Sequence, residues 1–168
     1  MPFSSEKFAA IEDIVKDASL VAQTLIFEKA QKKRKLNWQQ PEDRAVVART
    51  VRVFRGLIAA KPDKYHRNYG QLGYALKDQP MPDWAGSVAA LRKAIALRGD
   101  TPDSGTGYYE FNLAVGLIHI DSDFKQGRAS GAASRAEIAA NLDSGKTVID
   151  LKTEPVIVQW AALNGYAV

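Results

Sequence analysis

The sequence contains no cysteine, and His66 and His119 are its only histidines. Without cysteine the chain can form no disulfide, no thiolate nucleophile and no cysteine-ligated zinc site. Because the two histidines lie far apart in the sequence, arrangements of a nucleophile with a histidine base are also scarce. We therefore expect that the protein is not an enzyme and that it holds no cofactor or metal.

Long apolar runs are missing as well. No segment approaches the roughly 20 apolar residues that a membrane helix needs. The first residues, from Met1 to Glu6, have neither the basic segment nor the apolar segment of a secretory signal. We therefore expect no membrane association and a cytoplasmic location. With 46% hydrophobic and 25% charged residues the composition is that of a globular protein, and residues 1–168 are predicted to form a single helical domain.

Signals for β-strands are weak, and helical spacing dominates. The only β-branched stretches are 147–149 and 156–158, and no alternating runs are joined by hairpin turns. Apolar residues instead recur at spacings of three and four, which places them on one face of a helix. The predicted class is therefore all-α. The predicted helices, about seven in number, cover residues 6–35, 41–61, 64–78, 83–98, 105–120, 132–148 and 154–164.

The first two predicted helices form a long N-terminal hairpin over residues 6–61, which is broken at Pro41. The second helix is amphipathic. Its apolar side contains Val46, Val47, Val51, Val53, Phe54, Leu57 and Ile58. Its opposite side carries four arginines within about 140° of arc. These arginines and the lysine-rich end of the first helix define the basic patch, which consists of Lys32, Lys33, Arg34, Lys35, Arg44, Arg49, Arg52 and Arg55.

The positive charge of the chain is concentrated around this basic patch. Residues 29–67 carry a net charge of +9, whereas residues 1–28 carry −3 and residues 68–168 carry −2. Such a segment favours contact with nucleic acid or with an acidic protein, although a solvated helix face has the same composition. Aromatic residues suited to base stacking are few there, since only Trp38 and Phe54 occur and Phe54 faces the core. Nucleic-acid binding through this patch would therefore be weak and electrostatic.

The segment from Tyr69 to Leu97 combines aromatic, small and apolar residues at helical spacing. It resembles one tetratricopeptide repeat in the aromatic residue that opens the first helix, the Leu-Gly pair at 72–73, the small residue at Ser87 and the Lys-Ala-Ile run near the end. Small residues at these places let two antiparallel helices approach closely. Residues 108–114 resemble the start of a second repeat of this kind. The sequence departs from the family pattern in a longer turn at 79–82 and in a glycine where the family usually has proline.

The resemblance implies antiparallel helical hairpins stacked as a short right-handed α-solenoid, with repeat-like hairpins over 65–148 and a capping helix over 154–164. It also implies a partner groove along the first helix of each hairpin. Asn112 matches the asparagine with which some members hold a peptide backbone or a terminal carboxylate, but the accompanying basic residues are not clearly matched, so a general peptide groove is implied. The implied groove residues are Arg67, Tyr74, Lys77, Tyr108, Phe111, Asn112 and His119, with Gly70, Asp78 and Val115 beside them.

Two further patterns are similar to known binding motifs. His119, Asp121 and Asp123 have the chemistry of divalent-cation ligands, but they are more typical of a helix end at which an aspartate caps the next helix. Residues 144–147 read Ser-Gly-Lys-Thr, like the tail of a phosphate-binding loop. That motif needs a glycine where Ala140 stands, and no apolar strand precedes it. We therefore predict neither a metal site nor a phosphate site.

These observations favour a non-enzymatic adaptor or scaffold that binds a protein or peptide partner, or copies of itself, through a helical surface. Repeats of this kind often serve as one module of a larger signalling or defence assembly. Electrostatic nucleic-acid binding through residues 29–67 is the alternative. The last predicted helix is expected to cap the core rather than to offer an apolar patch to a partner.

Overall fold

The structure, a computed structural model, describes residues 41–79, 81–100 and 106–168, with the side chains of the first helix described from Ala48 onward. The predicted helix over 6–35 lies outside these residues. Within them the chain is helical and contains no strand, so the all-α prediction is confirmed. The elements are α2 (Pro41–Ala60), α3 (His66–Asp78), α4 (Trp84–Arg98), α5 (Tyr108–Ile120), α6 (Ser122–Lys125), α7 (Ala132–Gly145), the 3-10 turn η1 (Leu151–Thr153) and α8 (Pro155–Asn164).

Local side chains explain where several helices begin. Asp83 precedes α4 as its N-cap, and its Oδ1 accepts a hydrogen bond of 2.8 Å from the backbone N–H of Gly86. Asp121 precedes α6 and accepts hydrogen bonds of 2.8 and 3.2 Å from the backbone N–H groups of Asp123 and Phe124. The short helix α6 was not predicted. Its single turn is too short to show a helical period in the sequence.

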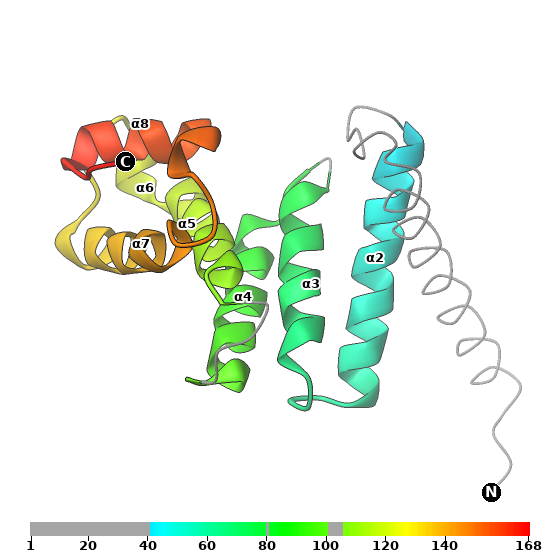
Figure 1. The fold of residues 1–168 in the computed structure, drawn as a ribbon. Coiled ribbons are helices and arrows are strands. Elements are labelled where there is room, and N and C mark those ends of the chain that lie inside the picture. Colours follow the sequence, from blue (N-terminus) through cyan, green and yellow to red (C-terminus); the bar gives the residue numbers. More distant parts are fainter. Residues whose placement is uncertain (1–40, 80, 101–105) are drawn as a thin grey trace, which may run out of the picture.

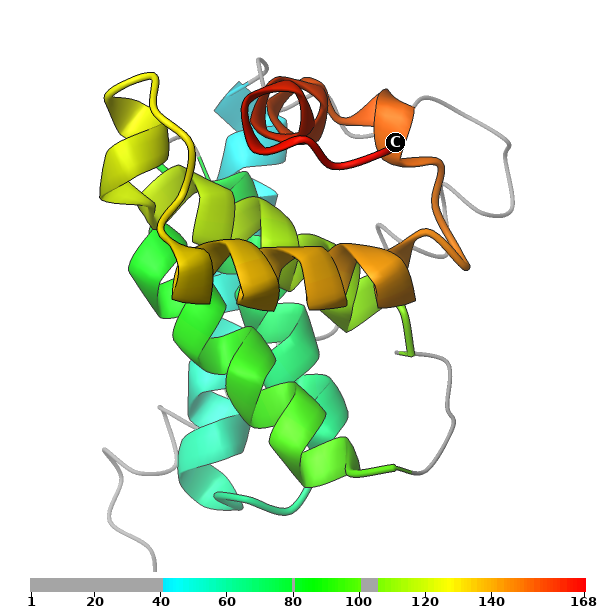
Figure 2. The ribbon, with the colours of Figure 1, turned by 90° about the vertical axis from the view of Figure 1, so that its left-hand side faces the viewer.

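From α2 to α5, helices that follow one another in the chain pack against one another, and α7 packs against α5. The main contacts join α2 with α3, α3 with α4, α4 with α5, and α5 with α7. In Figure 1, α2, α3 and α4 stand side by side, and α5 to α8 form the other half of the molecule. Figure 2 shows α7 lying across α5, with α8 above both helices in that view. The right-handed solenoid implied by the repeat resemblance stays a prediction.

The close contact between α3 and α4 depends on small residues, as the repeat resemblance implied. A methyl group added at Gly73 would lie 2.6 Å from Cγ of Leu91, which is fully buried. The hydroxyl of Ser87, also fully buried, donates a hydrogen bond of 2.8 Å to the backbone carbonyl of Gly73. Because both positions lack a bulky side chain, the two helix backbones approach each other directly.

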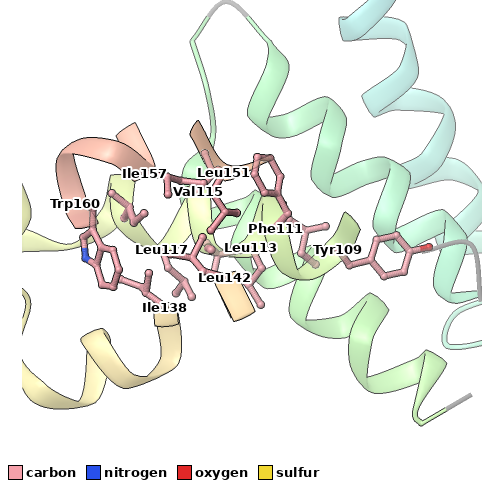
Figure 3. Packing of buried hydrophobic residues seen from close by; sticks show 14 of the residues in the cluster. Tyr109, Phe111, Leu113, Val115, Leu117, Ile138, Leu142, Leu151, Ile157 and Trp160 are labelled. Carbon is pink, nitrogen blue, oxygen red and sulfur yellow. The ribbon is translucent and has the colours of Figure 1, made fainter. Parts of the chain in front are cut away.

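Two hydrophobic clusters hold the described helices together. The smaller one lies between α2, α3 and α4 and contains Val51, Leu72, Ala75, Leu76 and Ala90. The larger one joins α4, α5, α7 and α8, and its fully buried side chains include Leu91, Ile118, Ile138, Leu142, Ile157 and Trp160. Figure 3 shows this larger cluster, with Trp160 at one end and Tyr109 at the other.

The last helix, α8, covers one end of this larger cluster. Ile157, Trp160 and Ala161 are buried, whereas Leu163 is 44% exposed. The indole N–H of Trp160 donates a hydrogen bond of 2.8 Å to Oγ of Ser130, so the one polar group of this buried side chain has a partner. Ile157, Trp160 and Ala161 therefore face the core, and Leu163 remains at the surface. None of the helices in the described part of the chain combines the length and apolarity needed to cross a membrane.

Candidate functional site

Helices α3 and α5 carry side chains at the same spacing. Steps of four, three and four residues place each set on one face of its helix. The set on α3 consists of Arg67, Gln71, Tyr74 and Asp78, and the set on α5 consists of Tyr108, Asn112, Val115 and His119.

An open cavity of about 340 Å³ lies between these two helices, and we call it the α3–α5 cavity. It brings together five of the groove positions implied by the repeat resemblance, and these are Arg67, Tyr74, Asp78, Tyr108 and Asn112. The other lining residues are Gln71 and Tyr109. Gln71 lies one helical turn after Arg67 on the same face, so its position follows from the spacing alone.

Tyr109 contributes to this cavity but was not predicted to do so. Its side chain is 3% exposed, and its hydroxyl lies 3.2 Å from Nδ1 of His66. Gly70 makes room for the ring, because a methyl group added at Gly70 would collide with the Tyr109 phenol. The implied groove position at Gly70 is thus filled by an aromatic side chain from the neighbouring helix.

Tyr74 lies beside Tyr109, with ring centroids 6.0 Å apart. Burial raises the pKa of the Tyr74 hydroxyl well above its ordinary value, and the neighbouring Tyr109 and Glu110 add to this shift. The hydroxyl therefore stays protonated at physiological pH. It can donate a hydrogen bond to a ligand in the α3–α5 cavity.

A buried ion pair fixes the start of α5 behind this cavity. Nη2 of Arg98 lies 2.5 Å from Oε1 of Glu110, and the two side chains are only 9% and 10% exposed. The other oxygen of Glu110 accepts a hydrogen bond of 2.8 Å from the backbone N–H of Gly107. Gly107 has a φ of 80°, which favours glycine, so the chain turns there and α5 begins at Tyr108 rather than at the predicted residue 105.

Phe111 and Val115 do not line the α3–α5 cavity, although the resemblance placed them at the groove. Phe111 is 8% exposed and Val115 is 3% exposed, and both belong to the larger hydrophobic cluster. For Phe111 the cause is α7, which packs against α5 so closely that a methyl group added at Gly145 would lie 2.9 Å from Cβ of Phe111. The placement of Phe111 at an accessible groove position is therefore corrected. Lys77 does not line the cavity either and forms an ion pair of 2.5 Å with Asp78.

His119 lies at the other end of α5, in different surroundings. Its ring stacks on the indole of Trp84, with centroids 3.8 Å apart and planes at 10°. Burial lowers the pKa of His119, and the positive charges of Lys125 and Lys77 lower it further. His119 is therefore mostly neutral at physiological pH. It borders a second open cavity, of about 720 Å³, between the end of α5, α6 and α8, which we call the α5–α8 cavity.

The cluster of His119, Asp121 and Asp123 does not converge on one point. Asp121 caps α6, and Asp123 forms an ion pair of 2.6 Å with Arg128. Burial acts to raise the pKa of the Asp121 carboxyl, but the backbone N–H groups of Asp123 and Phe124 and the neighbouring Ser130 side chain hold it below its ordinary value. Within residues 41–79, 81–100 and 106–168, no three histidine, aspartate or glutamate side chains are placed to share a metal ion.

The basic patch is only partly described. Arg49, Arg52 and Arg55 are exposed on α2. The side chain of Arg44 and all of Lys32, Lys33, Arg34 and Lys35 lie outside the described residues.

Comparisons of this chain with protein-family models, with curated proteins and with solved structures give no match. The likeness to tetratricopeptide repeats therefore depends on the residues of this chain alone.

Proposed function

We propose that this protein is a non-enzymatic adaptor that binds a peptide segment of a protein partner in the α3–α5 cavity. The observation that carries the proposal is that Arg67, Tyr74, Tyr108 and Asn112, which the repeat resemblance implies as groove residues, line one open cavity. A volume of about 340 Å³ lies at the lower end of the range for ligand sites. Such a volume suits a few residues of a peptide.

The polar groups of this cavity complement a peptide backbone. Gln71 and Asn112 carry side-chain amides, and each amide offers both a hydrogen-bond donor and an acceptor. The Asn112 amide is held in one orientation because its Nδ2 donates a hydrogen bond of 2.8 Å to the carbonyl oxygen of Tyr108. That orientation leaves Oδ1 of Asn112 as an acceptor for a backbone N–H of the peptide.

The aromatic groups of this cavity supply apolar contact area. Tyr74 and Tyr108 each offer a ring face and a hydroxyl, a combination enriched at protein interfaces. Tyr108 is 44% exposed, so its ring is accessible to a partner. The buried pair of Arg98 and Glu110 holds the α5 residues in place before a ligand arrives, which lowers the entropy lost on binding.

The length of the α3 stripe indicates how much peptide the surface can hold. Arg67 and Asp78 are separated by eleven residues of helix, which corresponds to roughly 16 Å at 1.5 Å per residue. An extended peptide of about five residues covers the same distance. We therefore expect the partner to contribute a short linear segment.

The proposal is tested by capturing partners from a native extract with the tagged full-length protein. We expect a protein partner that resists nuclease treatment and that is lost with the double variant Tyr108→Ala/Asn112→Ala. The matched control is Tyr65→Ala, which removes an exposed tyrosine outside the α3–α5 cavity. Thermal unfolding of all variants checks that they fold. Equal capture by the double variant and by the wild type would refute the assignment of the site.

A second proposal, electrostatic nucleic-acid binding through the basic patch, is supported by the exposure of Arg49, Arg52 and Arg55 on α2. Partners of this kind would vanish with nuclease, and their affinity would fall steeply with salt. The triple variant Arg49→Gln/Arg52→Gln/Arg55→Gln should abolish that binding and leave the α3–α5 cavity intact. Nucleic-acid binding that does not change with salt would rule out this second proposal.

A further inference from the structure

The α5–α8 cavity is lined mainly by apolar side chains. Its volume is about 720 Å³, and its lining residues are Ile118, His119, Phe124, Lys125, Gly127, Val156, Gln159, Ala162 and Leu163. Leu163 is 44% exposed, so a large aliphatic side chain faces solvent at its rim. An open apolar cavity of this size lies within the range of ligand-binding sites.

Hydrogen bonds fix the walls of this cavity. The backbone N–H of Ser130 donates to Oδ1 of Asn164 over 2.8 Å, which ties the segment after α6 to the end of α8. The indole N–H of Trp160 donates to Oγ of Ser130, also over 2.8 Å. Asp121 caps α6 and thereby places Phe124 and Lys125 on the opposite wall. The cavity is therefore a fixed feature of the packing of α5, α6 and α8.

The charge at its rim is positive and uncompensated. Lys125 is exposed, and among the ion pairs that join described residues none includes Lys125. None of the described residues that line the α5–α8 cavity is acidic. The nearby Lys77 and Lys125 both add positive potential at His119. A ligand carboxylate would therefore be attracted to this rim, next to the apolar surface.

We propose that the α5–α8 cavity binds an acidic, amphipathic peptide segment of a protein partner. A large apolar side chain of the segment would lie among Ile118, Phe124 and Leu163, and a neighbouring carboxylate would pair with Lys125. This site is separate from the α3–α5 cavity, because the two cavities share no lining residue. Either proposal can therefore fail while the other holds.

The test is a selection of random twelve-residue peptides displayed on phage against the immobilised full-length protein. We expect enrichment of peptides that carry Leu, Ile or Phe with Asp or Glu within the next four residues. Synthetic copies of the selected peptides should bind the Ala162→Glu variant at least tenfold more weakly than they bind the wild type. The glutamate side chain occupies the cavity, and its negative charge repels the carboxylates of the peptide. The matched control Ala140→Glu changes an exposed alanine of α7 outside the cavity and should bind like the wild type.

Charge reversal distinguishes a direct contact from a structural role of Lys125. The Lys125→Glu variant should lose affinity for the acidic peptides. It should instead bind copies of these peptides in which lysine replaces each acidic residue. The ring signals of His119 in NMR spectra should shift when the acidic peptide binds the wild type, because the imidazole lies at the cavity. Tyr108→Ala/Asn112→Ala should leave this binding unchanged.

Three results would overturn the proposal. The first is a selection that enriches no apolar–acidic peptides. The second is equal binding of the selected peptides by the wild type and by Ala162→Glu. The third is a set of peptides that lose affinity with Tyr108→Ala/Asn112→Ala and keep it with Ala162→Glu. Peptides of that third kind bind the α3–α5 cavity and support the proposed function instead.

Discussion

One stripe of side chains runs along α5 from Tyr108 to His119, and its two ends lie in different surroundings. At the N-terminal end, Tyr108 and Asn112 face a cavity that α3 supplies with Arg67 and Asp78. At the C-terminal end, His119 borders a cavity that α6 and α8 supply with mainly apolar side chains. The surroundings of each end of this stripe are decided by the helices packed beside it. We therefore propose that the two ends of the stripe receive different kinds of ligand group.

The two ends are also stabilised in different ways. Behind the α3–α5 cavity, the start of α5 is fixed by the ion pair of Arg98 and Glu110. Beside the α5–α8 cavity, α8 is fixed by burial of Ile157 and Trp160 in the larger hydrophobic cluster. Substitutions at the two ends should therefore lower the free energy of unfolding by different amounts, and different second substitutions should restore it.

The largest effect is expected at the apolar end. Trp160 is fully buried, so Trp160→Ala should lower the free energy of unfolding by about 3–5 kcal/mol through loss of burial and creation of a cavity. Trp160→Phe keeps most of the ring but removes the donor to Ser130, and it should cost about 1–3 kcal/mol. Urea unfolding of the three proteins gives the comparison. A loss for Trp160→Ala that does not exceed the loss for Trp160→Phe would contradict the importance of apolar burial at this end.

At the polar end, Arg98→Met should lower the free energy of unfolding by about 3 kcal/mol, because it leaves the Glu110 carboxylate buried without its partner. The double variant Arg98→Met/Glu110→Gln removes that buried charge and should recover part of the loss. Urea unfolding of the single and double variants forms a thermodynamic cycle. If the double variant is no more stable than Arg98→Met, the ion pair does not fix the start of α5.

An intermediate effect is expected between the two ends, where α7 covers the middle of α5. A methyl group added at Gly145 would lie 2.9–3.2 Å from the Cβ, Cα and N atoms of Phe111, and backbone atoms cannot rotate away. Gly145→Ala should therefore cost about 2 kcal/mol of unfolding free energy. The control Gly131→Ala meets nothing closer than 3.8 Å, so its effect should be smaller. Equal unfolding midpoints for the two variants would show that α5 and α7 can separate without cost.

The smallest effect is a pH dependence at the apolar end. Burial, Lys125 and Lys77 lower the pKa of His119 below the ordinary histidine value of 6.5, so the unfolded chain binds a proton there more readily than the folded chain. This histidine should therefore add stability as the pH rises from its lowered pKa to about 6.5, and the gain is lost as the pH falls through that window. NMR titration of the imidazole measures the midpoint. Lys125→Glu should raise that midpoint, and a midpoint that does not change would contradict the electrostatic coupling.

The helices could be predicted from the sequence because their signals are local. Pro41 is the first residue of α2, and Asp83 caps α4. Apolar residues at spacings of three and four run through each long helix. The groove residues Arg67 and Tyr74 were implied by the repeat resemblance, and they lie two turns apart on one face of α3.

The surroundings of α5 could not be predicted, because they depend on residues distant in the sequence. Phe111 was placed in the groove, since nothing near it in the sequence shows that Gly145 packs against it. The role of Tyr109 depends on the space left by Gly70, some forty residues earlier. The division of one expected groove into two cavities depends on where α8 lies, and helical spacing gives no information about that.

The most direct test of peptide binding in the α3–α5 cavity is site-specific photo-crosslinking of the full-length protein in cells. A photoreactive side chain is placed at Gln71, which is exposed and lines the cavity, and in a second protein at Arg135, which is exposed on α7 outside both cavities. We predict a covalent protein adduct from position 71 that is abolished by Tyr108→Ala/Asn112→Ala, and no such adduct from position 135. Identical adducts from both positions, or an adduct at position 71 that survives the double variant, would contradict the proposed function.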